Sequence, residues 1–266
     1  MGGTKKPMYI TIPGLDDGIT LKAIFTTRFG GVSSPPYDTL NLSFQRDDDR
    51  NNVIENYRLL SNETGIPPDH MVLTWQVHGD KISMVDKSHC GMGLVREHEL
   101  GYTDGLITAE KNIALVTIHA DCVPVYLYDP VNSVIALVHS GWRGTLLNIA
   151  AKAIKLMKGR YNCKAGNIIA AVGPHIRKCC FEVRNDVYDI FLEKFPYYSY
   201  LFEPYGNNYR IDLEGIITRT LIAEGLDTRN IHDIKRCTVC EKGLFFSHRG
   251  GHGNTGAGAA VLMMVG

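Results

Sequence analysis

Apolar positions along the chain follow two periods, one typical of strands and one typical of helices. Short apolar or alternating runs predict strands at residues 19–25, 71–77, 81–85, 113–118, 123–128, 134–138, 168–172 and 259–265. Apolar positions spaced three to four apart predict helices at residues 47–63, 144–157, 185–195 and 213–224. Because the two kinds of element are interspersed and several strand pairs look antiparallel, we expect an α+β fold of mixed sheets layered with helices.

The connections between these elements are short. Residues 129–132, with the sequence DPVN, predict a hairpin turn between two strands, and Gly65 with the following prolines ends the first helix. The 266 residues contain no internal repeat, low-complexity segment or long linker. We therefore expect a single domain over residues 1–266.

Composition limits the kinds of partner that the chain can be expected to bind. The chain has 28 Lys and Arg against 28 Asp and Glu, and this balance gives no bulk electrostatic case for nucleic acid or an anionic membrane. No apolar run reaches the roughly 18–20 residues of a membrane span, and no secretory signal is visible. Seven irregularly spaced cysteines do not suggest a disulfide framework, so we expect a reducing, cytoplasmic environment.

Three short segments place reactive side chains at the ends of predicted strands. They are QVHG at residues 76–79, ADCVP at 120–124 and HSGWRG at 139–144. A buried strand needs neither His nor Cys at its end, and flanking glycines allow distant segments to converge there. Two imidazoles and a thiolate suit zinc, so we expect His78, Cys122 and His139 to bind the metal and leave a fourth position open.

Other interpretations of these residues stay open. Cys122 could act without metal as a nucleophile with His139 as its base, which would indicate a Cys–His amidohydrolase. Asp121 could orient that base or hold a substrate hydroxyl, and it is also a candidate to protonate a leaving base. The same residues could also be a packed cysteine and two ordinary histidines, or a non-catalytic site for a metal or nucleoside.

Arginines beside glycines predict anion binding. Arg143 lies in a turn that opens a predicted helix, where backbone N–H groups and the helix dipole favour an anion. Arg28 and Arg249 also precede paired glycines. These side chains suit phosphate or carboxylate.

The remaining cysteines and His119 give weaker signals. Cys237 and Cys240 form one CxxC without a second pair, and zinc or redox chemistry there is not the favoured interpretation. Cys179 and Cys180 are adjacent, and we expect buried thiols that do not act together. His119 is three residues before Cys122 and should point away from the site.

Several ordered motifs together resemble the laccase-domain family, whose members are purine nucleoside phosphorylases formerly called polyphenol oxidases. The matching segments are FTTRFGGVS, YDTLNL, QVHG, DGLIT, ADCVP, HSGWRG, AAVGPHIRKCCFEV and FFSHR. They cover nearly the whole chain. The resemblance implies a mixed fold like the catalytic domain of cytotoxic necrotizing factor.

The resemblance also implies an activity and a site. It implies phosphorolysis of adenosine, inosine and methylthioadenosine, with adenosine deamination as a side activity. We expect a monomer or homodimer. It implies zinc at His78, Cys122 and His139, with Asp121 as a further catalytic candidate. Substrate or phosphate would be bound by Arg28, Asn41, Gln76, Arg143 and Arg249.

The older name of the family implies copper-dependent phenol oxidation. Multicopper oxidases use His-x-His pairs, and none of the ten histidines here stands in one. A single copper ion could still replace zinc, since copper(II) binds such sites more tightly. The chain also departs from the family pattern, since glycine stands after Arg249 where a second arginine is usual and Ala257 replaces another arginine. Weaker phosphate binding is the expected consequence.

Overall fold

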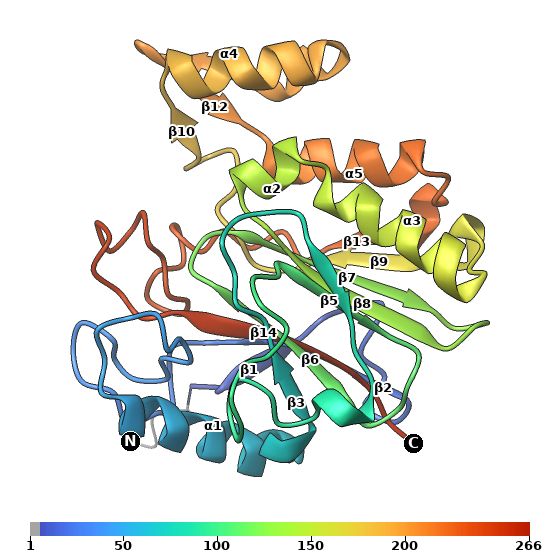
Figure 1. Cartoon of the computed structure of the whole chain (residues 1–266). Helices are drawn as coiled ribbons and strands as arrows, with labels where there is room; N and C mark the ends of the chain where they lie inside the picture. Colours follow the sequence, from blue (N-terminus) through green and yellow to red (C-terminus); the bar gives the residue numbers. More distant parts are fainter. Residues whose placement is uncertain (1–5) are drawn as a thin grey trace.

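Two sheets lie face to face at the centre of the computed structural model, which describes residues 6–266 (Figure 1). The first sheet contains, in spatial order, β1 (Tyr9–Thr11), β2 (Leu21–Thr26), β14 (Gly258–Met264), β6 (Ala114–His119) and β3 (Met71–Leu73). The second contains β13 (Ile231–Asp233), β9 (Ile169–Val172), β7 (Val123–Asp129), β8 (Val134–Ser140), β5 (Gly105–Thr108) and β4 (Ile82–Met84). Both sheets mix parallel and antiparallel pairs, which confirms the α+β prediction.

Helices cover the outer face of each sheet (Figure 1). The α-helices are α1 (Arg50–Thr64), α2 (Trp142–Leu146), α3 (Ile149–Tyr161), α4 (Asn185–Lys194) and α5 (Leu213–Ala223). Helix α1 packs on the first sheet, and α3 and α5 pack on the second. Short 3-10 helices are η1 (Pro68–His70), η2 (Lys87–His89), η3 (Ala165–Asn167), η4 (Pro196–Leu201) and η5 (Thr228–Asn230). Across residues 6–266, no helix combines the length and apolar character needed to span a membrane.

The layers explain why the central strands are apolar at most positions on both of their faces. In β14, Ala260 and Leu262 face the second sheet, whereas Ala259 and Val261 face α1. Strand β8 alternates in the same way between the inter-sheet core and the helices α3 and α5. Because side chains of a strand point alternately to its two faces, a strand covered on both faces needs a continuous apolar run.

Most predicted helices and strands are present, but they begin or end at other residues than predicted. The hairpin of β7 and β8 is confirmed, with Asp129 paired to Val134. The predicted helix at 144–157 is instead two helices, because Asn148 between them adopts a left-handed φ of 56°. The predicted strand at 71–77 ends at Leu73.

A small third sheet was not predicted. It contains β10 (Glu182–Val183), β12 (Asn208–Ile211) and β11 (Phe202–Tyr205), and it carries α4 away from the main layers (Figure 1). Its strands are only partly buried, so they lack the continuous apolar run by which the central strands could be recognised.

Candidate functional site

His78, Cys122 and His139 converge at one end of the second sheet. Cys122 directly precedes β7, and His139 is the second-last residue of the antiparallel neighbour β8, where it is paired with Pro124. His78 lies in the loop between β3 and β4. One donor atom from each of the three side chains lies within 4.8 Å of the others.

Gln76 lies three residues beyond the end of β3, in the loop that carries His78. Its side-chain oxygen accepts the Ile118 N–H at 2.6 Å, and its amide nitrogen donates to the Ile118 carbonyl at 2.8 Å. The side chain thus takes the place that a further residue of β3 would have beside β6. This is why the strand predicted at residues 71–77 stops early. The Gln76 amide is already hydrogen-bonded to backbone, although the residue borders the cavity described below.

The buried carboxylate of Asp104 holds two of the three site residues. It accepts hydrogen bonds from the backbone N–H groups of Val77, His78 and Gly79 at 2.8–3.1 Å. It also bonds Nδ1 of His139 at 2.9 Å. Since a carboxylate only accepts, His139 carries its proton on Nδ1 and presents Nε2 to the site. Carboxylate–histidine pairs of this kind commonly orient metal ligands.

Electrostatics favour a charged thiolate at Cys122 in the metal-free protein. Desolvation raises the pKa of Cys122, but the charge and hydrogen bonding of His139 and His78 outweigh it and lower the pKa to about 6. Desolvation lowers the pKa of His139, while Cys122 and Asp104 raise it to about 9. A thiolate beside an imidazolium therefore exists near neutral pH, and either a metal ion or a substrate carbon can accept its electron pair.

Gly141 and His119 fix the close packing around Cys122. A Cβ atom on Gly141 would lie 2.9 Å from Sγ of Cys122 and 3.1 Å from Cδ2 of His78, so no larger residue fits there. Contrary to the sequence prediction, His119 lies beside the site, with its ring centroid 5.2 Å from that of His139. Its Nδ1 contacts the Cys122 carbonyl at 3.0 Å, and burial lowers its pKa, so a neutral His119 supports the Cys122 backbone.

A cavity of about 450 Å³ opens above these residues. His78, Cys122 and His139 line it, together with Arg46, Arg143 and Arg249. Among residues 6–266, no carboxylate forms an ion pair with any of these three arginines. Volume and charge together suit a small polar ligand with an anionic group.

Asp121 also lines the cavity, but both of its oxygens are engaged. Oδ1 accepts a hydrogen bond from Oγ1 of Thr238 at 2.6 Å, and Oδ2 accepts the backbone N–H of Arg249 at 2.7 Å. These contacts give Asp121 a positioning role for the Arg249 loop. They leave it poorly placed for the proton transfer considered from the sequence.

Two predicted binding residues lie outside the cavity lining. The guanidinium of Arg28 donates to the Asp38 carboxylate and to the Lys242 carbonyl. The buried Asn41 amide donates to Asp48 and accepts the Ala257 N–H. Both side chains join loops around the site, so their polar groups are already satisfied by protein.

Sequence reasoning overlooked two residues of the site. Arg46 lines the cavity, and Asp104 supports His78 and His139. Burial lowers the pKa of Arg46, while the charges of Tyr37, Asp121 and Cys122 act in the opposite direction. The signal for Arg46 was an arginine just before the three aspartates at residues 47–49 that precede α1. The signal for Asp104 was an acidic residue directly before a buried strand. Neither is distinctive until the fold brings them to the site.

Comparison with known proteins gives one consistent family. The family model described as multi-copper polyphenol oxidoreductase laccase matches residues 22–265. Purine nucleoside phosphorylase YlmD of Geobacillus stearothermophilus is 37% identical over 240 residues, which are 89% of this chain and 88% of that protein. Purine nucleoside phosphorylase LACC1 of Homo sapiens is 31% identical over 84% of this chain and 51% of its own length.

Solved structures agree with these matches. The crystal structure of YlmD from Geobacillus stearothermophilus is 33% identical and has a TM-score of 0.90, covering 99% of this chain and 98% of its own. Bacillus licheniformis hypothetical protein YfiH is 34% identical with a TM-score of 0.88, covering 92% of each chain. The sequence and the fold therefore place this chain in the multi-copper polyphenol oxidoreductase laccase family, among relatives named purine nucleoside phosphorylases.

Proposed function

We propose that this protein is a zinc-dependent purine nucleoside phosphorylase. The observation that carries the proposal is the meeting of two chemical groups in one cavity. Two imidazoles and a thiolate lie within 4.8 Å of one another, and three arginines without carboxylate partners among residues 6–266 line the same space. The names of the relatives support the same activity.

The three ligating residues fit zinc. Tetrahedral zinc with bonds of about 2.0–2.3 Å needs donor atoms roughly 3.3–3.8 Å apart. The donor atoms of His78, Cys122 and His139 all lie within 4.8 Å of one another, which is compatible with this spacing. Asp104 holds His139 in the tautomer that ligation needs. When bound, zinc would supply Lewis-acid polarisation of an oxygen or nitrogen of the substrate.

The protein's own residues account for the binding of phosphate. Arg46, Arg143 and Arg249 would bind phosphate and neutralise its charge as it approaches the ribose. In phosphorolysis, a phosphate oxygen forms a bond to C1′ while the C1′–N9 bond breaks, and the base leaves with the electron pair and takes up a proton. Adenosine, inosine and methylthioadenosine are the proposed nucleosides, and deamination of adenosine is a proposed side activity.

Copper is a weaker candidate than zinc. Within residues 6–266, the two side-chain groups able to hold a metal contain at most two histidines, whereas a multicopper cluster needs many more. A single copper ion could replace zinc at His78, Cys122 and His139, because copper(II) binds nitrogen and sulfur ligands tightly.

The direct test is product analysis with purified protein. Adenosine is incubated with and without phosphate, and the products are separated by chromatography. We expect adenine and ribose 1-phosphate only when phosphate is present, and Cys122→Ala should abolish their formation. Inosine without phosphate would establish the deaminase activity, and survival of adenosine in both samples would contradict the proposal.

A second candidate function is a metal-independent Cys–His hydrolase. The pKa of Cys122, lowered to about 6 beside His139, favours it because an active thiolate exists without metal. In that case iodoacetamide would stop turnover, while a chelator would leave it unchanged. Loss of turnover on chelation and recovery with zinc would exclude this alternative.

A further inference from the structure

Four cysteines outside the cavity converge from two loops, although their spacing along the chain does not combine them. Cys179 and Cys180 follow β9, and Cys237 and Cys240 follow β13. Strands β9 and β13 are parallel neighbours, so their carboxyl ends lie at the same edge of the second sheet. A bridge between His175 and Cys237 continues this pairing into the loops.

The sulfur positions match a tetrahedral metal site. Sγ of Cys180 lies 3.5 Å from Sγ of Cys240, and Sγ of Cys179 lies 3.7 Å from both Cys180 and Cys240. All four sulfurs are within 4.8 Å of one another. Zinc–sulfur bonds of about 2.3 Å require sulfur separations of roughly 3.8 Å in a tetrahedron, close to those observed.

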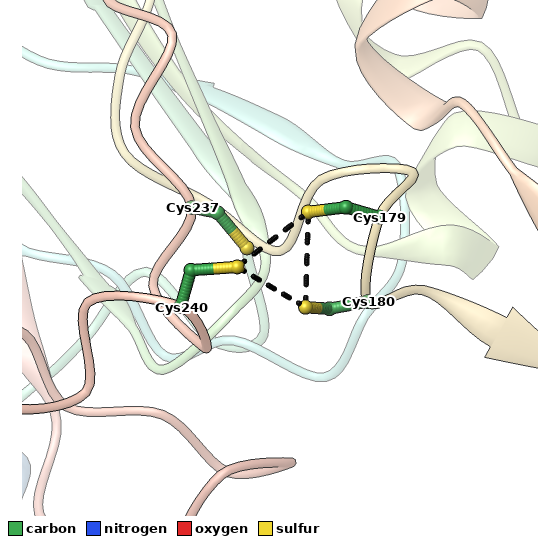
Figure 2. A group of neighbouring side chains, drawn as sticks. All are labelled: Cys179, Cys180, Cys237 and Cys240. Atoms are coloured by element: carbon green, nitrogen blue, oxygen red, sulfur yellow. Dashed lines mark hydrogen bonds between the residues drawn. The ribbon is translucent and has the colours of Figure 1, made fainter.

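The adjacent pair can act together because it lies in a turn. In a strand, neighbouring side chains point to opposite faces. Here the N–H groups of Cys180 and Phe181 both donate to the Arg177 carbonyl, and the resulting turn brings both sulfurs to one side. Figure 2 shows Cys179 and Cys180 facing Cys237 and Cys240 across the gap between the loops. The expectation of independent buried thiols is therefore wrong.

The surroundings of the four thiols favour one shared metal ion over a disulfide. Cys240 lies almost equally near Cys179 and Cys180, so the geometry selects no disulfide pair, and all four thiols are free. Cys237 is buried while Cys179 and Cys240 reach solvent, which gives a metal ion access from one side. Soft thiolate ligands in a tetrahedral set select zinc or iron among common metals.

The cluster is joined to the wall of the cavity. Thr238, inside the CxxC segment, donates to Asp121, the residue next to Cys122. Nη1 of Arg249 donates to the carbonyls of Cys180 at 3.3 Å and Glu182 at 3.1 Å. A metal ion that holds both loops in place would thus also hold Asp121 and Arg249 in position.

We propose that Cys179, Cys180, Cys237 and Cys240 bind one zinc ion in a closed four-thiolate site that holds this wall of the cavity. The site is separate from His78, Cys122 and His139, and it does not depend on the reaction performed there. With four protein ligands it has no open position, so its role is structural. The metal would cross-link the two loops in the folded protein.

Metal analysis of variants tests this proposal. Protein is purified under reducing conditions, and zinc is measured by mass spectrometry for the unchanged chain, the Cys179→Ser/Cys180→Ser variant and the control Cys90→Ser. We expect the double variant to contain about one zinc per chain less than the unchanged protein. Cys90→Ser, which alters a thiol outside both groups, should lose none.

Cobalt spectroscopy separates the two metal sites and guards against misfolding. Cobalt(II) added to metal-free Cys122→Ser should give the intense visible and charge-transfer bands of a four-thiolate site. These bands should be absent when Cys179→Ser/Cys180→Ser is combined with Cys122→Ser. Cys240→His should retain the metal with weaker thiolate bands, because imidazole replaces one sulfur.

Stability gives an independent readout. Removing the metal should lower the Tm of Cys122→Ser by roughly 5–10 °C, and readdition of zinc should restore it. Equal zinc in the unchanged protein and in Cys179→Ser/Cys180→Ser would overturn the proposal. Iron instead of zinc, or disulfides among the four cysteines in freshly reduced protein, would also overturn it.

Discussion

Asp104 and His139 share a hydrogen bond of 2.9 Å in which both side chains are almost fully buried. Desolvation raises the pKa of Asp104, yet His139 and the backbone N–H groups of Gly79 and Val77 lower it below the ordinary value. The carboxylate is thus ionised, and it fixes at once the ring of His139 and the loop of His78. One residue thus controls the geometry of two of the three proposed metal ligands.

Replacing this carboxylate should weaken metal binding. Asp104→Asn keeps the size of the side chain but places amide hydrogens against backbone N–H groups, so we expect zinc affinity to fall about 10- to 100-fold. Competition with a chromophoric chelator measures the change. Asp80→Asn, which alters a surface pair with Lys152, is the matched control. Equal affinity in both variants would show that Asp104 does not orient the ligands.

Gly141→Ala should disturb the same three residues by steric contact. The added methyl group would lie 2.9 Å from Sγ of Cys122, so the sulfur or the turn must shift and metal affinity should fall at least about 10-fold. Gly159→Ala is the control, because nothing lies within 4 Å of its new Cβ on α3. That variant should gain roughly 0.5–1 kcal/mol of unfolding free energy and retain full metal binding. Unimpaired metal binding by Gly141→Ala would contradict the close packing.

The reactivity of Cys122 should depend on pH in a distinctive way. In metal-free protein its pKa is about 6, below the ordinary 9.0, so the thiolate is present above that pH and is lost as the pH falls through about 6. Alkylation by iodoacetamide, followed by peptide mass analysis, should therefore rise with pH around 6. Zinc should protect Cys122.

Cys90 provides the internal reference for that measurement. Burial, together with Asp69 and Glu110, raises the pKa of Cys90 above its ordinary value. Its alkylation should accelerate only in alkaline solution. Equal pH profiles for Cys90 and Cys122 would argue against a thiolate stabilised by His139.

Removal of Arg46 should impair phosphate use. Arg46→Ala deletes a half-buried cation without a carboxylate partner among residues 6–266, so we expect the KM for phosphate to rise roughly 10- to 100-fold, equivalent to about 1.5–3 kcal/mol. The KM for the nucleoside should change less. Arg58→Ala, which removes an exposed pair with Glu55 on α1, should leave both constants unchanged. An unchanged phosphate KM in Arg46→Ala would remove this residue from the phosphate site.

The sequence predicted the parts of the fold that depend on local pattern. The apolar runs of β7, β8 and β14 were recognisable because both faces of each strand are buried. The break at Asn148 was not, because a left-handed residue within an amphipathic pattern leaves the apolar period intact. The small sheet of β10, β11 and β12 also escaped, because its exposed positions carry no clear alternation.

The site was predictable where a residue type is unusual for its position. His78, Cys122 and His139 lie at the ends of predicted strands and were identified as one group, and the structure brings them together. Arg28 and Asn41 could not be distinguished from cavity residues, since their partners Asp38 and Ala257 are known only from the fold. The four-cysteine cluster depends on the parallel pairing of β9 and β13, which no spacing within the sequence encodes.

The central position of β14 has a consequence for synthesis of the chain. Ala260 pairs with Phe25 on one side and with Thr117 on the other, so β14 joins β2 to β6 in this sheet. During synthesis, β2 leaves the ribosome before its partner β14, which is made more than 230 residues later. Such distant pairing favours slow folding and leaves an open sheet edge meanwhile. The nascent chain should therefore be a natural client for chaperones until β14 inserts.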